Sequence, residues 1–272
     1  MPVQFPECKW KPNVIRRQVN AVKSSTLVVE VETDDGLAFV KGVNNPAGNE
    51  SLSFELVGTR LARAIGLDTP EFAILDHDFL DLVRFDASPV PMGPVFASKA
   101  ISGSTGGERT PFLEQLVNPE AVPLLVAFDT WISNFDRCPP PDYLDPTPNW
   151  DNVFFVAEGR RFRLIVFDHT HCFAEGELDM ALENNGYRDD LRVFGKFPEF
   201  NDFLSEGSFL KALENIHKVD VSTIEQIIDE IPEEWELTFS ARDAWIRQIV
   251  ERRDLLEELI LADLSAQMRL KL

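Results

Sequence analysis

Three polar side chains at the ends of apolar segments carry the strongest chemical signal in this chain of 272 residues. Asp136 follows an apolar segment, Asn152 directly precedes residues 153–156, and Asp168 ends residues 162–167. One carboxylate can orient an attacking hydroxyl while the other two groups hold magnesium on the phosphates of a nucleotide. Magnesium prefers a few hard oxygen ligands, with water and phosphate completing its shell. The pattern therefore indicates phosphoryl transfer.

A lysine on an apolar strand face is the next candidate. Alternation within the strand expected at residues 37–43 places Lys41 on the same face as Leu37 and Phe39. Its ammonium group must then reach solvent or meet negative charge. Glu55 borders the apolar stripe of the following helix and could face Lys41. The alternative is a lysine that only protects a sheet edge.

The elements that position these residues change character along the chain. Hydrophobic periodicity and turn residues predict strands at 27–31, 37–43, 72–75, 95–101, 153–156 and 161–167, and helices at 50–65, 119–133, 208–217, 222–230 and 240–264. A flexible glycine-rich stretch at 102–107 suggests a lobe boundary. The order predicts an α+β fold with two lobes, a small β-rich N-lobe in residues 1–104 and a mainly helical C-lobe in residues 105–272.

Composition restricts the possible partners and the compartment. The net charge of −20 repels phosphate backbones, so we expect no direct binding to nucleic acid or to anionic membranes. The odd number of cysteines, three, favours a reducing cytosol. The N-terminus lacks the pattern of a signal peptide, and no apolar run approaches the thickness of a bilayer. These features predict a cytoplasmic protein and leave its oligomeric state open.

Several segments follow one another in the order of a known family. They are Phe39-Val-Lys41, Asn49-Glu-Ser-Leu-Ser-Phe-Glu55, Leu61-Ala-Arg-Ala-Ile-Gly-Leu-Asp-Thr-Pro70, Val95-Phe-Ala-Ser-Lys-Ala-Ile-Ser-Gly103 and Asp129-Thr-Trp-Ile-Ser-Asn-Phe-Asp136-Arg137. Over roughly residues 20 to 175 the chain resembles the HipA-like kinases, a distant branch of the protein-kinase-like superfamily. The resemblance implies a two-lobed protein-kinase-like fold that uses ATP and Mg²⁺.

The resemblance also implies a role for each candidate residue. Lys41 would touch the nucleotide phosphates, Glu55 would hold Lys41, and Asp136 would be the catalytic base or orient the acceptor hydroxyl. The metal ligands would be Asn152 and Asp168, and the remaining nucleotide-binding candidates are Ser24, Ser25 and Lys99.

Two features depart from the family pattern. The phosphate loop expected to be rich in glycine reads Asn20-Ala-Val-Lys-Ser-Ser-Thr26, although small hydroxyl residues could still let backbone amides reach phosphate. In addition, Asn152 lies 16 positions after Asp136, because a proline-rich segment intervenes. That segment either loops out without effect or reshapes the substrate site. Asn149 is a weaker alternative ligand, since Asn152 directly adjoins the strand.

Other polar residues have simpler interpretations. Asp129 lies on a buried helix and is expected to form structural hydrogen bonds, while Asn134 could frame the loop around Asp136. A zinc site at His169, His171 and Cys172 is disfavoured, because no second cluster of histidine or cysteine supplies further ligands. Cys138 lacks an evident histidine base, so it is not expected to act as a nucleophile.

The leading functional hypothesis is an ATP- and magnesium-dependent phosphotransferase that acts on a serine or threonine hydroxyl of a protein substrate. A kinase for small molecules would use the same groups. The alternative from another class is a pseudokinase that serves as a binding or regulatory module. The glycine-free loop and the long insertion favour that alternative, whereas the presence of Asp136, Asn152 and Asp168 in order argues against it.

Overall fold

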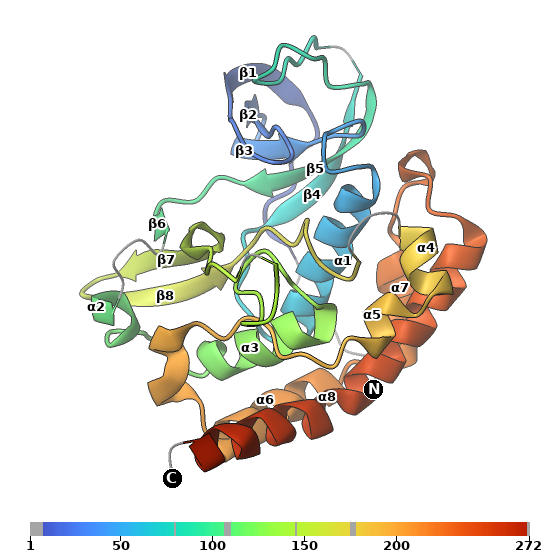
Figure 1. Cartoon of the computed structure of the whole chain (residues 1–272). Coiled ribbons are helices and arrows are strands. Elements are labelled where there is room, and N and C mark those ends of the chain that lie inside the picture. The colour runs from blue at the N-terminus through green and yellow to red at the C-terminus, as the bar shows by residue number, and fades with distance from the viewer. Residues whose placement is uncertain (1–7, 79, 106–109, 145, 175–177, 271–272) are drawn as a thin grey trace.

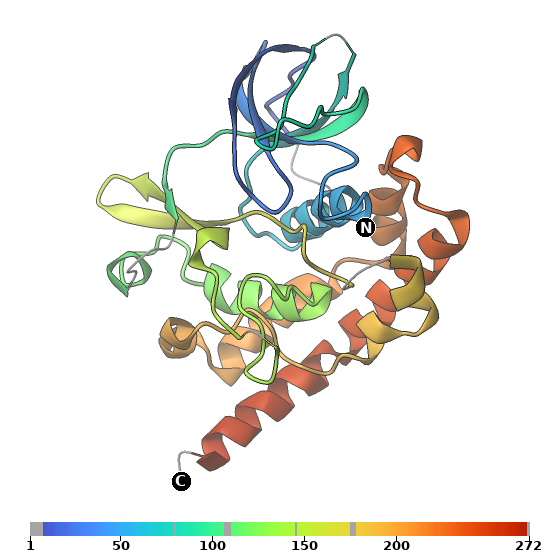
Figure 2. The ribbon, with the colours of Figure 1, turned by 45° about the horizontal axis from the view of Figure 1, so that its top comes forward.

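The strands of the first third form one antiparallel sheet that stands above a layer of helices (Figure 1). The computed structural model describes residues 8–78, 80–105, 110–144, 146–174 and 178–270. Figure 2 shows the same arrangement from another side, with helix α1 (Glu50–Ala64) beneath the sheet. The structure confirms the predicted α+β fold with a small β-rich N-lobe and a mainly helical C-lobe.

The sheet of the N-lobe has the strand order β1-β2-β3-β5-β4. Its strands are β1 (Ile15–Ala21), β2 (Val29–Thr33), β3 (Gly36–Lys41), β4 (Phe72–His77) and β5 (Gly93–Lys99). The sequence pattern did not predict β1. This strand lies at the edge of the sheet, and Ile15 is its one buried residue, while Arg16 and Arg17 are exposed. An edge strand therefore needs no apolar alternation, and its sequence gives little signal.

The two faces of this sheet pack against different partners. One face is covered by Trp10 and contains Val31 and Val40 in its own apolar cluster. The other face contains Phe96, which packs with Leu52 and Leu56 of α1. Lys41 lies directly opposite Phe96 in the ladder between β3 and β5, so it also faces α1.

Helix α1 lies between the sheet and the C-lobe. It ends near Ile65 because Gly66 adopts a left-handed conformation with φ of +93°. Most of its side chains are buried, since it also packs against α7 (Val221–Asp229) below. The helix therefore holds Glu55 at a fixed depth beneath the sheet.

A second, smaller sheet links the lobes. It consists of β6 (Ser104–Thr105), β7 (Val153–Glu158) and β8 (Arg161–Val166), and the last two form the predicted hairpin around Gly159. Gly159 has a φ of +65°, which a glycine adopts without strain. The strand β5 ends at Lys99, and Ser104 of β6 pairs with Phe155 of β7.

The C-lobe is built around one buried helix. All residues of α3 (Ala121–Ile132) are buried, as its apolar sequence predicts. The other helices are α2 (Thr110–Leu113), α4 (Leu178–Glu183), α5 (Gly186–Asp189), α6 (Glu206–His217), α7 and α8 (Phe239–Leu270). Both α6 and α8 pack on α3, and α8 runs along the base of the lobe (Figure 1).

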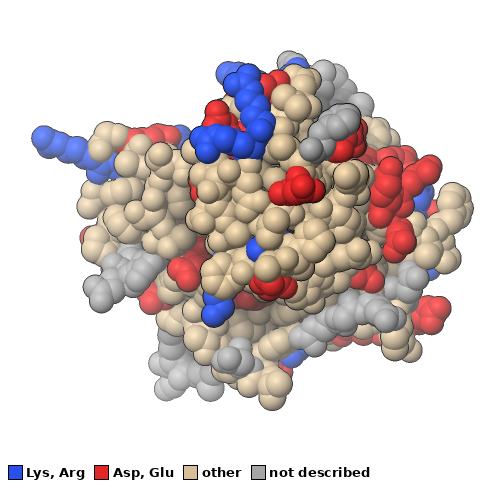
Figure 3. Space-filling view, turned by 90° about the horizontal axis from the view of Figure 1, so that it is seen from above, with Lys and Arg blue, Asp and Glu red and all other residues tan. Residues whose placement is uncertain are grey.

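Charges are distributed unevenly over the surface. Seen from above the N-lobe, one group of basic side chains stands out, while acidic side chains occur in several places (Figure 3). Arg17 on β1 pairs with Glu32 on β2 at 2.5 Å. Among the helices of the described residues, none has the length and hydrophobicity needed to cross a membrane.

Candidate active site between the lobes

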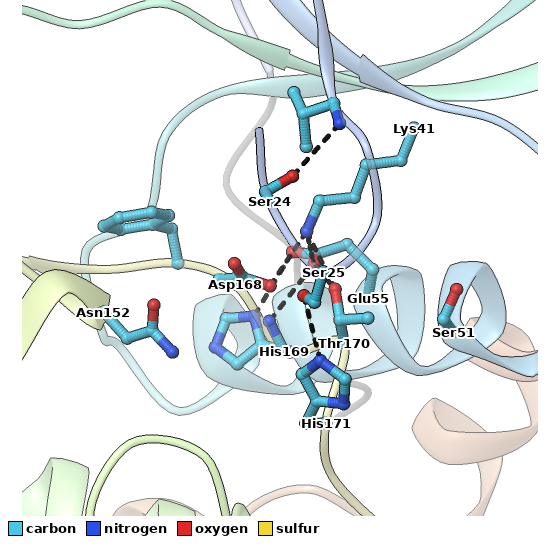
Figure 4. A network of polar contacts seen from close by, with 12 residues as sticks. Ser24, Ser25, Lys41, Ser51, Glu55, Asn152, Asp168, His169, Thr170 and His171 are labelled. Atoms are coloured by element: carbon cyan, nitrogen blue, oxygen red, sulfur yellow. Dashed lines mark hydrogen bonds and ion pairs between the residues drawn. The ribbon is translucent and has the colours of Figure 1, made fainter. Parts of the chain in front are cut away.

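A lysine between two carboxylates forms the centre of the candidate site (Figure 4). Lys41 ends β3, and its Nζ donates hydrogen bonds to Glu55 Oε2 at 2.7 Å and to Asp168 Oδ1 at 2.9 Å. The same atom donates to the hydroxyl of Thr170 at 2.8 Å. Lys41 comes from the sheet, Glu55 from α1 and Asp168 from the segment after β8. The structure thus brings together three residues from distant parts of the chain.

Burial and charge act in opposite directions on this cluster. Burial by itself would lower the pKa of Lys41, but the charges of Asp168 and Glu55 outweigh it and raise that pKa above its ordinary value. Burial would raise the pKa of both carboxyl groups, yet the charge of Lys41 holds each pKa below its usual range. All three groups are therefore charged at neutral pH, and Lys41 is held firmly in place.

Asp168 reaches the lysine because the chain turns after β8. Asp168 was expected directly after a strand at residues 161–167, but the strand already ends at Val166. Asp168 itself has a φ of +57°, in the left-handed region that aspartate adopts more readily than most residues. Its side chain is 28% exposed, so the carboxylate is not closed off from solvent.

Glu55 is held by the same segment that contains Asp168. It accepts a hydrogen bond from the Thr170 hydroxyl at 2.9 Å and another from the backbone amide of His169 at 3.2 Å. The Thr59 hydroxyl, one turn further along α1, lies 3.4 Å from the other oxygen of Glu55. The sequence analysis did not predict a role for Thr170. Its position two residues after Asp168 was the one signal that it could lie in the site.

Asp136 and Asn152 meet directly despite the proline-rich segment between them. Asn152 Nδ2 donates to Asp136 Oδ2 at 2.5 Å, and Asn149 Nδ2 lies 3.4 Å from the other oxygen of Asp136. Asn134 Oδ1 accepts hydrogen bonds from the backbone amides of Asp136 and Arg137, both at 3.2 Å. Asn134 thus frames the turn that presents Asp136, and Asn149 supports Asp136.

Arg137 connects this turn to the metal-binding candidates. Its guanidinium group is fully buried and forms a short ion pair with Asp129 on α3. It also donates to the backbone carbonyls of Asn152 at 3.1 Å and Phe167 at 2.8 Å, the latter one residue before Asp168. Burial raises the pKa of Asp129 to about 7, against the opposing effect of Arg137. Asp129 is therefore a structural partner, as expected, whereas the anchoring position of Arg137 was missed.

The glycine-free loop between β1 and β2 reaches the segment after Asp168. Ser24 stabilises the loop, because its hydroxyl accepts a hydrogen bond from the backbone amide of Val28 at 3.1 Å. At the tip, the Ser25 hydroxyl lies 3.1 Å from His171 Nε2 (Figure 4). Ser25 therefore lies beside the segment that follows Asp168.

Lys99 is the exception among the predicted nucleotide-binding residues. It pairs with Ala38 in the ladder, on the face of the sheet that points away from Lys41. Its Nζ lies 3.3 Å from Glu71, which also binds the backbone amides of Lys9 and Trp10. The strand was predicted correctly, but Lys99 lies three positions after Phe96, the residue opposite Lys41. Side chains three positions apart on a strand point to opposite faces of the sheet. We therefore leave Lys99 out of the candidate site.

The histidines and cysteines near Asp168 have other partners. His169 Nδ1 lies 3.2 Å from the Thr59 hydroxyl, and the Cys172 thiol contacts the His169 carbonyl at 2.7 Å. Within the described ranges, no three residues of the types His, Cys, Asp and Glu gather as a metal site. Burial raises the pKa of Cys138 to about 12, which disfavours a thiolate nucleophile.

The remaining oxygen atoms fit magnesium. Asn152 uses its Nδ2 to contact Asp136, so its Oδ1 points away from that carboxylate. Asp168 uses Oδ1 to contact Lys41, and its Oδ2 is a second hard oxygen. One carboxylate and one amide oxygen, completed by water and phosphate, match the ligands that Mg²⁺ prefers.

Comparisons with known proteins concern the family and the fold. A family model described as HipA-like kinase matches residues 14–259. The crystal structure of a Helicobacter pylori proinflammatory kinase, CtkA, is similar with a TM-score of 0.59 and 14% sequence identity, covering 96% of this chain and 98% of that chain. At this identity the likeness concerns the fold. A search of curated proteins found no match.

Proposed function

This chain belongs to the HipA-like kinase family, and we propose that it transfers the terminal phosphoryl group of ATP to a serine or threonine hydroxyl of a protein. The observation that carries the proposal is the contact of Lys41 Nζ with both Glu55 and Asp168. Phosphate oxygens would replace the contacts of this ammonium group with Asp168 and Thr170, while Glu55 keeps it in position. Such positioning and charge neutralisation lower the barrier to phosphoryl transfer.

Each residue has a definite task in this proposal. Lys41 binds the phosphates, and Glu55 fixes the direction of its side chain. Asp168 and Asn152 hold Mg²⁺, which neutralises charge on the phosphates when bound. Ser24 and Ser25, in the loop between β1 and β2, contact the phosphates of the nucleotide.

Asp136 acts on the acceptor. Its carboxylate accepts the hydrogen bond of the incoming hydroxyl and thereby directs the oxygen lone pair towards the phosphorus. Asn152 and Asn149 contact the two oxygens of Asp136, so the carboxylate cannot rotate freely. Arg137 directly follows Asp136 and donates hydrogen bonds to the backbone carbonyls of Asn152 and Phe167. It therefore fixes the position of Asp136 relative to the two metal-binding segments.

Labelled ATP tests this function without knowledge of the acceptor. The protein is incubated with Mg²⁺, ATP labelled at the terminal phosphate and a dephosphorylated bacterial protein extract, and acid-stable label is then assigned by phosphoamino-acid analysis. We expect label on serine or threonine and a loss of about 100-fold or more in Asp136→Asn. Asp151→Asn is the matched control, since Asp151 is an exposed neighbour of Asn152.

The outcomes separate the alternatives. Equal labelling by wild type and Asp136→Asn would contradict the role of Asp136. Label in metabolites of the extract, and none in protein, would indicate a small-molecule kinase. No magnesium-dependent label in either fraction would favour the pseudokinase.

A further inference from the structure

A cavity next to the catalytic turn is not used by the nucleotide-binding residues. Its volume is about 350 Å³, within the range of ligand-binding pockets. Ser133 and Phe135 line it from the turn that contains Asp136, and Tyr187 and Phe194 line it from a later part of the C-lobe. A second cavity of about 550 Å³ is lined by Asp136 itself.

The two cavities adjoin each other. Phe135, Tyr143 and Arg192 line both of them, so a molecule bound in one lies beside the other. The larger cavity contains the carboxylate of Asp136, where the acceptor hydroxyl has to be placed. The smaller cavity is therefore within reach of groups next to that hydroxyl.

The proline-rich segment builds the wall between these cavities. Tyr143 stacks on Phe135 with ring centroids 6.2 Å apart and meets Phe194 edge-on at 6.3 Å. The Arg192 guanidinium lies 4.7 Å from the Tyr143 ring centroid and pairs with both oxygens of Asp190. The long spacing between Asp136 and Asn152 thus shapes the acceptor side of the site. The wall therefore combines aromatic rings with the paired charges of Arg192 and Asp190.

Exposed apolar side chains surround these cavities. Leu144 is fully exposed, Met180 is 58% exposed and Leu191 is 61% exposed. Leu144 and Met180 line the larger and the smaller cavity, respectively, and Leu191 stands between Asp190 and Arg192, which line the smaller one. Single exposed apolar residues are common, but exposed apolar residues that line two adjoining cavities beside Asp136, on a chain with a net charge of −20, indicate a contact surface.

We infer that the acceptor is a polypeptide in which a large apolar side chain, aromatic or long aliphatic, lies next to the phosphorylated serine or threonine and enters the smaller cavity. This inference rests on the proposed function and specifies its substrate. Leu144 and Met180 contact the flanking residues of the acceptor. Acidic flanking residues are disfavoured, because Asp136 and Asp142 line the larger cavity.

A positional peptide library tests the inference. Each library has a central serine or threonine and one fixed neighbour, which is phenylalanine, leucine, glycine, arginine or aspartate, and phosphate transfer from labelled Mg–ATP is measured. We expect phenylalanine or leucine at one position to exceed glycine and aspartate by about tenfold or more, because contact of an apolar side chain with the aromatic rings of the cavity discriminates by about this factor.

Variants connect the preference to this surface. Tyr143→Ala and the double variant Leu144→Ser/Met180→Ser should reduce the preference for phenylalanine or leucine to about threefold or less. The control Met92→Ser removes an apolar side chain of comparable exposure (69%) from the N-lobe, and it should retain the preference of wild type.

Titration with Mg–ATP distinguishes a failure of the proposed function from a failure of the inference about the acceptor. Absence of nucleotide binding in folded wild type would contradict the proposed function itself. Nucleotide binding without transfer to any library would contradict the protein acceptor of the proposed function. Transfer without positional preference, or a preference that persists in both surface variants, would overturn the inference about the neighbouring side chain.

Discussion

Replacing Arg137 by methionine tests whether one buried cation holds the catalytic and metal-binding segments together. The guanidinium group contacts the carboxylate of Asp129 and the backbone carbonyls of Asn152 and Phe167. Methionine is flexible and fills much of the same space, so lost polar contacts rather than a cavity should dominate the effect.

The expected loss is a large part of the stability of the protein. Removing one partner of a buried ion pair costs about 3–5 kcal/mol, because the other charge stays buried without compensation. Typical proteins have an unfolding free energy of about 5–15 kcal/mol. The Arg137→Met variant should therefore fold but unfold at a much lower denaturant concentration.

The loss should also depend on pH in a direction set by Asp129. Burial raises the pKa of this carboxyl to about 7 in the folded protein, while an unfolded aspartate has a pKa of about 3.9. Between these values the folded state binds a proton that the unfolded chain has released, so this group's contribution to stability falls as the pH rises. Without Arg137 the folded pKa moves higher, and the variant should be more destabilised at about pH 8 than at about pH 6.

Urea unfolding of four proteins provides the assay. Wild type is compared with Arg137→Met, with the double variant Arg137→Met/Asp129→Asn, and with Arg188→Met, which breaks an exposed pair with Asp189 and should cost at most about 1 kcal/mol. The double variant should recover part of the stability and lose the additional pH dependence. A loss below about 1 kcal/mol for Arg137→Met, or the same loss at both pH values, would refute the reasoning.

Two further variants test other parts of the structure. The folded pKa of Glu55 is lowered, so its contribution to stability is present above the unfolded value of about 4.3 and is lost as the pH falls. In acid titrations followed by circular dichroism, Glu55→Gln should therefore be less stable than wild type at neutral pH and lose less on acidification; parallel curves would contradict this. Gly195 has a φ of +73°, and an added Cβ would lie 2.5 Å from Asp129 Oδ2, so Gly195→Ala should lower the unfolding free energy by about 1–3 kcal/mol. Gly207→Ala in α6 has open space and should be neutral or stabilising in the same urea assay.

Local patterns were sufficient to predict much of the fold and the centre of the site. Helix α1 has an apolar stripe that ends at Gly66, α3 has a mostly apolar sequence that follows Pro119, and the structure contains both near the expected positions. The partnership of Lys41 with Glu55 followed from two short-range facts, a lysine on an apolar strand face and an acid at the border of the next helix. Such features depend on neighbours within one or two elements.

The features that sequence reasoning missed depend on contacts across the chain. β1 is stabilised by pairing with β2 and needs little burial of its own. The orientation of Lys99 follows from the register between β3 and β5, which the length of a strand does not reveal. Arg137 gains its importance from carbonyls 15 and 30 positions further along the chain. Its sequence position gave no indication of complete burial, since arginine is ordinarily exposed.

Calorimetric titration of ATP in the presence of Mg²⁺ tests the central claim most directly. We expect magnesium-dependent binding to wild type and a loss of about tenfold or more in affinity for Asp168→Asn, because the variant lacks the charged metal ligand. Asp151→Asn, the exposed control, should bind as wild type does. Equal binding by wild type and Asp168→Asn, or no binding by folded wild type, would contradict the assignment of Lys41, Glu55 and Asp168 as a nucleotide site.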